Sequence, residues 1–243
     1  MKYVVLQKAI ADAGVASRRK AEEFILKGFV LVNKKKVTAL GTRVDPDRDE
    51  ITVRGKTIRK EPVVYFALNK PKGILSSVSD DRGRKTVVNL IKTTARIVPV
   101  GRLDIDTSGL ILLTNDGDLV NRLTHPSFEK EKEYLVHVEV PKRWSNKDID
   151  SAIRNMQRGV IVAGGFKTSP AAVKIVARRG KIEFELSVVI HEGKKHQIRR
   201  MVSAVGMSVC SLKRVRIGSV VLGDLALGAH RELGEEEIAS LQK

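Results

Sequence analysis

The stretch GRLDIDTSGLILLTNDG, residues 101–117, constrains the fold most, because it joins a polar loop to a buried strand. Its apolar run LILLT has the length and composition of a core strand, and the following TNDG is a turn sequence. Gly101 and Gly109 permit a tight loop before the strand. That loop carries Asp104 and Asp106, and catalytic residues often lie on loops anchored in this way. The spacing alone fits a catalytic loop, a metal loop or a plain turn.

Other segments predict the elements around this loop. Strands are expected at VVYFALNKPKG, EYLVHVEV, KIEFELSVVI and SLKRVRIGSVVL. A helix is expected over SNKDIDSAIRNMQRG, with Ser145 as its N-cap and Gly159 at its end. Its apolar stripe consists of Ile149, Ala152, Ile153 and Met156. Strands of mixed length with few helices indicate the α+β class with a largely antiparallel sheet.

Composition excludes several classes of protein. The 243 residues are 42% hydrophobic and 30% charged, which is globular composition. No apolar run approaches the roughly 18 residues of a membrane span, and the start MKYVVLQKAIAD does not read as a signal peptide. The single cysteine, Cys210, excludes an internal disulfide and cysteine-rich zinc sites. We therefore expect a cytoplasmic protein without a membrane segment.

The charge points to a polyanionic partner. Lys and Arg number 45 against 28 acidic residues, a net charge of +17, and nucleic acid is the commonest partner of such a protein. Residues 1–60 carry 15 basic and 7 acidic side chains, or +8, which leaves +9 for the other 183 residues. This asymmetry predicts a basic binding domain over 1–60 and a second domain over 61–243.

The first domain reads as two short helices and a hairpin. The second helix is expected to begin after Ser17 and to bury Ala21, Phe24 and Ile25. The sequence Asn33-Lys34-Lys35 reads as a turn between strands. Basic residues cluster at the start of the second helix and at this turn. A solvated helix face is the alternative reading of that cluster.

Residues 4–55 resemble the αL RNA-binding module found in a ribosomal protein of the small subunit. The resemblance rests on AGVASRRKAEEFILKGFVLVNKK and LGTRVDPDRDEITV. It implies contacts to RNA phosphates from polar and basic residues of the helix and the turn. These are Ser17, Arg18, Arg19, Lys20, Lys27, Asn33 and Lys34.

The rest of the chain resembles the pseudouridine synthases, in the RsuA/RluB branch that modifies ribosomal RNA. Five blocks match in order: LNKPKG, GRLDIDTSGLILLTNDG, EKEYLVHV, HEGKKHQIRRM and LKRVRIGSVVLG. The resemblance implies an α+β fold in which the αL domain precedes a mainly antiparallel catalytic domain. Such enzymes detach uracil from its ribose and rejoin it through carbon five. This isomerisation involves no redox step, and we expect neither cofactor nor metal.

The resemblance also implies roles for individual residues. Asp104 is the essential carboxylate, Arg199 its guanidinium partner, and Tyr134 the aromatic residue under the target base. Arg200 is expected as an RNA contact and is the alternative partner of Asp104. Further RNA contacts are expected from Arg102, Lys70 and Leu212, with Asn69, Lys70 and Pro71 supporting the loop from the neighbouring strand. Attack on the ring, attack on the ribose carbon and abstraction of a ribose proton all remain open.

Two neighbours of these residues are given a structural role instead of a catalytic one. Asp106 is interpreted as part of the loop's own structure, and His196 as a hydrogen-bonding residue at a helix start.

The expected substrate is ribosomal RNA, from the large subunit rather than the small one, either naked or within a pre-ribosomal particle. The protein is expected to be a monomer. The alternative function is a non-catalytic RNA-binding or ribosome-assembly factor. A DNA-binding protein is disfavoured because no helix-turn-helix or zinc pattern occurs.

Overall fold

The computed structural model describes residues 3–242, which divide into two compact units. The first unit is Met1–Val64 together with the short segments Thr93–Ile97 and Thr114–Gly117, and the second contains the remainder. The chain contains both helices and mostly antiparallel strands, which confirms the predicted α+β class. None of the helices described is long and apolar enough to cross a membrane.

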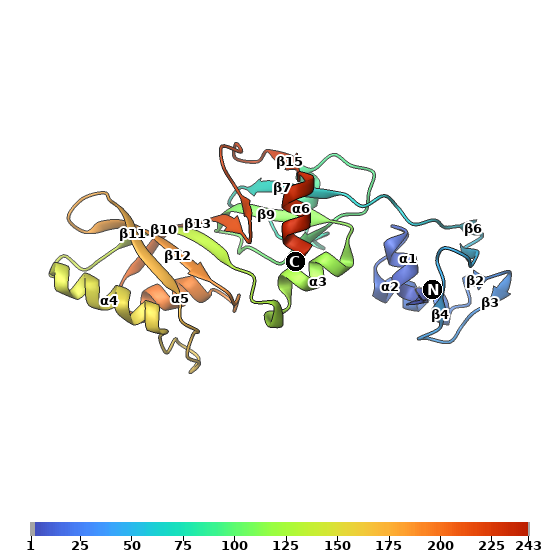
Figure 1. Ribbon diagram of the computed structural model, residues 1–243, viewed down its shortest axis with the longest axis horizontal. Helices are drawn as coiled ribbons and strands as arrows, with labels where there is room; N and C mark the ends of the chain where they lie inside the picture. The colour runs from blue at the N-terminus through green and yellow to red at the C-terminus, as the bar shows by residue number, and fades with distance from the viewer. Residues whose placement is uncertain (1–2, 243) are drawn as a thin grey trace. The chain divides into compact units, whose positions relative to one another are not determined.

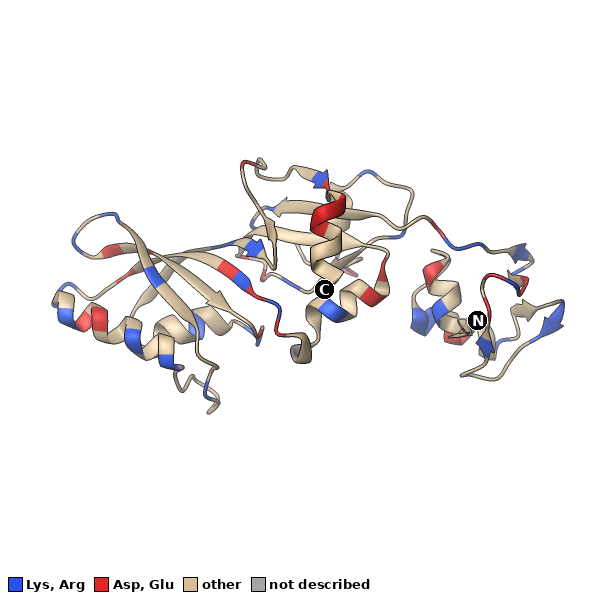
Figure 2. Ribbon diagram, viewed as in Figure 1, with Lys and Arg blue, Asp and Glu red and all other residues tan. Residues whose placement is uncertain are grey.

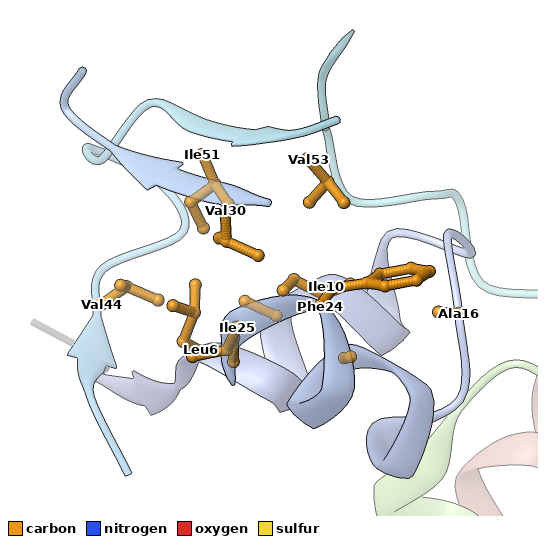
Figure 3. Packing of buried hydrophobic residues seen from close by; sticks show 11 residues of the cluster. Leu6, Ile10, Ala16, Phe24, Ile25, Val30, Val44, Ile51 and Val53 are labelled. Atoms are coloured by element: carbon orange, nitrogen blue, oxygen red, sulfur yellow. The ribbon is translucent and has the colours of Figure 1, made fainter. Parts of the chain in front are cut away.

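The first unit packs two helices against short strands (Figures 1 and 3). Its elements are β1 (Val4–Val5), α1 (Leu6–Asp12), α2 (Arg18–Leu26), β2 (Val30–Val32), β3 (Lys35–Lys36), β4 (Arg43–Val44), β5 (Ile51–Val53) and β6 (Lys56–Thr57). The strands pair as a sheet of order β3-β2-β5-β6 and a separate β1-β4 pair. Leu6, Ile10 and Ile25 from the helices pack against Val30 and Ile51 from the sheet. These aliphatic contacts form a core of its own for this unit.

Two local predictions for the first unit are confirmed. Ser17 is the N-cap of α2, where its side chain accepts a hydrogen bond from the backbone N–H of Lys20 at 3.2 Å. Asn33 and Lys34 form the two-residue turn between β2 and β3, with φ of 50° and 67°, whereas Lys35, also predicted in the turn, is the first residue of β3. Positive φ at both positions matches the twist of a tight hairpin.

From Tyr65 onward the chain builds a nine-stranded sheet with helices packed against it (Figure 1). Its strands are β7 (Tyr65–Lys70), β8 (Val98–Val100), β9 (Ser108–Thr114), β10 (Lys132–Glu139), β11 (Ala172–Arg178), β12 (Glu183–Ile190), β13 (Ser208–Ile217), β14 (Val220–Val221) and β15 (His230–Glu232). Their order is β11-β12-β10-β13-β9-β7-β15, with β14 beside β13 and β8 beside β9. The helical elements are η1 (Val87–Leu90), α3 (Gly117–Thr124), η2 (Pro126–Phe128), α4 (Asn146–Arg158), α5 (Gln197–Ala204) and α6 (Glu235–Gln242).

Helices cover the sheet in two groups. In Figure 1, α4 and α5 lie along β10–β13, and α4 contacts β11 while α5 contacts β13. Leu119 of α3 and Leu241 of α6 join a core cluster with Leu110 and Leu112 of β9. The sheet therefore has one part covered by α4 and α5 and another covered by α3 and α6.

The predicted helix over residues 145–159 is confirmed in detail. Ser145 and Asp148 form a reciprocal capping box, and Gly159 ends α4 with φ +83°. The four residues of the predicted apolar stripe are the buried residues of this helix. Strands β11 and β15 were not predicted. β15 is the polar triplet His-Arg-Glu, and its strand conformation comes from pairing with β7.

The sheet changes from antiparallel to parallel pairing where β9 meets β13. Ser108 pairs with Lys213 and Gly109 with Arg214 in parallel register. Gly109 has φ +104°, and a Cβ atom built there would lie 2.2 Å from the carbonyl oxygen of Arg214. Only glycine allows this approach, and the approach brings the loop before β9 alongside β13.

Candidate active site

The loop before β9 presents Asp104 on a fixed backbone. The N–H of Thr107 donates to the carbonyl oxygen of Asp104 at 3.0 Å, which closes a turn over residues 104–107. Leu103 and Thr107 are buried on either side, whereas the Asp104 side chain is 34% exposed. The loop thus anchors itself in the core and leaves one carboxylate accessible to solvent.

His196 lies directly beside that carboxylate. Its Nε2 is 3.4 Å from Oδ1 of Asp104. His196 is the N-cap residue of α5, which agrees with its predicted place at a helix start. Its φ is +54° instead of the extended value usual for an N-cap, and its side chain makes no capping hydrogen bond. The predicted place of His196 at a helix start is therefore confirmed, and its contact with Asp104 was not predicted.

Arg199 pairs with Asp106 in place of Asp104, which corrects the expected pairing. Its Nη2 lies 2.8 Å from Oδ2 of Asp106 and 3.5 Å from the Asp106 carbonyl oxygen. His196 and Arg199 are three residues apart at the start of α5, so their side chains emerge on one face. Two carboxylates spaced two residues apart lie against that face, and His196 pairs with Asp104 while Arg199 pairs with Asp106. Asp106 consequently does more than shape its own turn.

Gln197 holds the segment that carries His196. The residue is buried, its Oε1 accepts from the N–H of Lys194 at 3.0 Å, and its Nε2 donates to Glu192 at 2.6 Å. Gln197 was not among the residues expected at the site. The available signal was its place four residues before Met201, on the buried stripe of α5.

Lys70 is buried beneath the loop, which corrects its expected contact with RNA. The side chain is fully buried, and its Nζ donates to the carbonyl oxygens of Pro71 and Ile74, each at 2.9 Å. Burial lowers the pKa of Lys70 to about 8, against the opposing effect of the Asp106 and Asp104 carboxylates. A further contribution in the lowering direction comes from the charge of Arg214.

Tyr134 lies near these groups on the sheet. It is the third residue of β10, is buried, and lies directly opposite Arg214 of β13, so both side chains lie on one face. Leu212 is opposite Val136 on that face and is also buried. Nε of Arg214 donates to the carbonyl oxygen of Leu110 at 2.7 Å. Arg214 was not singled out, although its two-residue spacing from Leu212 in a predicted strand marked an inward-facing position.

A groove of about 350 Å³ opens beside the start of α5. Its lining consists of Ile161, Ala163, His196, Arg199, Arg200, Ser203 and Ala204. Arg200 and Lys194 both lie near the ring of Phe166, at 6.0 and 4.2 Å from its centroid. Arg200, an expected RNA contact, therefore lines the same groove as His196 and Arg199. Arg102, another expected RNA contact, is exposed on the loop itself.

Among residues 3–242, no group of three or more His, Cys, Asp or Glu side chains is arranged to hold a metal ion.

The expected RNA contacts of the first unit are all exposed. They are Ser17, Arg18, Arg19, Lys20, Lys27, Asn33 and Lys34. Figure 2 shows basic residues on α2 and on β3. Asn33 is partly committed to the fold, since its Nδ2 donates to Asp49 at 2.8 Å and its Oδ1 accepts from the N–H of Glu50 at 3.0 Å.

Comparison with known proteins identifies the family. Residues 64–204 match the RNA pseudouridylate synthase family, and residues 6–51 match the S4 domain. The chain is 44% identical to ribosomal large subunit pseudouridine synthase B of Bacillus subtilis, over 98% of this chain and 95% of that protein. It is 42% identical to an uncharacterized RNA pseudouridine synthase of Aquifex aeolicus, over 100% and 95%.

A solved structure agrees with this assignment. The crystal structure of a pseudouridylate synthase superimposes with a TM-score of 0.68 at 32% identity, covering 98% of this chain and 99% of that one. Its similarity extends over both units, and the loop with Asp104 and α5 with Arg199 fall inside the matched family region. The chain is a member of the RNA pseudouridine synthase family with an N-terminal S4 domain.

Proposed function

We propose that this pseudouridine synthase isomerises one uridine of large-subunit ribosomal RNA, with Asp104 as the reacting carboxylate and no cofactor. The observation that carries the assignment is the position of Asp104: its side chain is accessible on a loop with buried anchors and lies 3.4 Å from His196. The similarity to a relative named for the large ribosomal subunit supports the choice of RNA. The bond between C1′ and N1 breaks, a bond between C1′ and C5 forms, the hydrogen on C5 leaves to solvent as a proton, and N1 takes up a proton, so that product and substrate are isomers.

The surrounding side chains take supporting roles in this proposal. Arg199 holds the loop through Asp106 and adds positive charge near the reacting carboxylate. Tyr134 stacks on the target base, and Leu212 forms part of the wall beside it. Extruding a base from an RNA helix costs a few kcal/mol, and Arg102 and Arg200 offset part of this cost by contacting the RNA.

The S4 domain supplies affinity for the RNA in this proposal. Phosphate contacts from basic side chains provide a sequence-independent part of nucleic-acid binding. The exposed residues of α2 and the β2–β3 turn are the contacts we propose.

We further propose a cytoplasmic monomer that acts on naked RNA or on a pre-ribosomal particle. A stable dimer in sedimentation would contradict the monomer.

Release of tritium from ribosomal RNA labelled at carbon five of uracil tests the function. We expect release by the wild type and, for Asp104→Asn, a rate below about one-thousandth of it. Asp106→Asn is the matched control, because it removes the same charge two residues away. The Arg199–Asp106 ion pair is partly exposed and contributes about 0.2–1 kcal/mol, so Asp106→Asn should lose less than about tenfold in rate.

The outcomes separate the alternatives. Loss of activity in Asp104→Asn with RNA binding intact supports the proposal, and mapping the modified uridine identifies the subunit. Loss in Asp106→Asn alone would move the reacting carboxylate to Asp106. No release by the wild type from naked RNA, subunits or whole ribosomes would favour a non-catalytic RNA-binding or assembly factor.

A further inference from the structure

The segment after β7 holds the Asp104 loop from both sides. The hydroxyl of Ser76 donates to the carbonyl oxygen of Leu103 at 2.9 Å and accepts from the N–H of Leu103 at 3.1 Å. The N–H of Gly73 donates to the carbonyl oxygen of Ile105 at 2.7 Å. The residues immediately before and after Asp104 are therefore both fixed by this one segment.

We infer that Ser76 is a positioning residue for the reaction, which fixes the backbone that carries the Asp104 carboxylate. The inference rests on the proposed role of Asp104. Ser76 and Leu103 are both buried, so water does not replace these hydrogen bonds when the hydroxyl is lost. One hydroxyl satisfies both polar groups of the Leu103 backbone, and removing it frees the peptide next to the reacting residue.

The residues just before Ser76 are themselves held by hydrogen bonds. Lys70 holds the turn before it through the carbonyl oxygens of Pro71 and Ile74. Leu75 is fixed by two backbone hydrogen bonds, from its N–H to the Lys85 carbonyl at 3.1 Å and from the Val87 N–H to its own carbonyl at 2.9 Å. Because its own backbone is held in this way, the Ser76 hydroxyl can fix the position of the loop that carries Asp104.

The neighbouring serine provides a matched control. The Oγ of Ser77 is also buried, but it has no hydrogen-bond partner. Ser77→Ala removes the same atom one residue away without removing a contact to the loop. A general effect of deleting a buried hydroxyl in this segment would appear in both variants, and a positioning effect only at Ser76.

Single-turnover kinetics on the full-length enzyme test the inference. A misplacement of about 1 Å costs roughly 100-fold in rate, so we expect Ser76→Ala to lower the rate at saturating enzyme by about 10- to 100-fold. The RNA dissociation constant should stay within about twofold, because Ser76 is buried and does not contact RNA. Ser77→Ala should keep the wild-type rate within about twofold. Ser76→Cys, a weaker hydrogen-bonding group of similar size, should fall between Ser76→Ala and the wild type.

Each result decides for or against the inference. Equal rates for Ser76→Ala and Ser77→Ala would overturn it, as would a loss in Ser76→Ala that lies entirely in RNA affinity. Thermal unfolding of each variant monitors folding, and if Ser76→Ala does not fold, the rate of Ser76→Cys decides: a reduced rate with unchanged affinity supports the inference and a wild-type rate overturns it. Asp104→Asn in the same assay separates the two proposals, since full activity there refutes the role of Asp104 itself.

Discussion

Lys70 departs from one of its two sequence-based assignments, since it was expected both to contact RNA and to support the loop from the neighbouring strand. As a lysine of the motif LNKPKG in a basic protein, Lys70 was expected to contact RNA. Its Nζ instead donates hydrogen bonds to two backbone carbonyl oxygens, and its side chain is fully buried. Buried lysines are rare, since the charged form loses its hydration. Nearby carboxylates on the loop compensate for part of that loss.

The pKa of Lys70 predicts a pH dependence of stability. It is about 8 in the folded protein and 10.5 in the unfolded chain, so between these values the unfolded chain binds more protons. The contribution of Lys70 to the free energy of unfolding therefore rises with pH across this window, and the destabilising effect of its buried charge is fully present below about pH 8. Urea unfolding of the wild type and Lys70→Met should show the difference shifting in favour of the wild type between about pH 8 and 10.5. A pH-independent difference would contradict the shifted pKa.

At the scale of elements, the junction of β9 and β13 decides where the loop lies. The strand LILLT was predicted from its apolar run, and Gly109 was expected to permit a tight loop. The structure gives this glycine a second role, since it lets the backbone of Arg214 approach closely. A strand pairing between residues more than 100 positions apart has no signature in a local window of sequence.

Gly109→Ala should destabilise the protein strongly. The added Cβ would lie 2.2 Å from backbone oxygen at φ +104°, and we expect a loss of at least about 2 kcal/mol in the free energy of unfolding. Gly165→Ala is the control, because Gly165 has φ +80° but no atom within 4 Å of a new Cβ. It should lose only the backbone strain, about 1 kcal/mol. Equal losses in urea unfolding would show that the contact with β13 is unimportant.

At the scale of the whole molecule, basic charge is divided between two units, for which we propose separate tasks. The S4 domain has its own apolar core, and its α2 carries exposed basic residues from the first turn. The second unit carries the loop, α5 and the groove. The net charge of +17 is consistent with an RNA partner for the chain as a whole.

The double variant Arg18→Gln/Arg19→Gln should bind ribosomal RNA more weakly and with less dependence on salt. Each lost phosphate contact reduces the slope of log affinity against log salt by about 0.7–0.9, so we expect a reduction of about 1.5 for two contacts. Lys147→Gln/Arg154→Gln on α4 removes the same net charge from exposed positions elsewhere. Titrations of both variants over a range of salt should separate them, and identical slopes would show that net charge alone controls binding.

The amino-acid sequence was sufficient for the class of fold, the capped helix at 146–158, the apolar strand of β9 and the family blocks, because these depend on residues close together along the chain. It was not sufficient for the pairing of His196 with Asp104, the pairing of Arg199 with Asp106, the burial of Lys70 or the hydrogen bonds of Ser76. Ser76 lies 27 residues from Leu103, and Arg199 lies 93 residues from Asp106. Which basic group meets which carboxylate depends on how α5 packs beside the loop, and that packing is fixed only when the distant strands of the sheet come together.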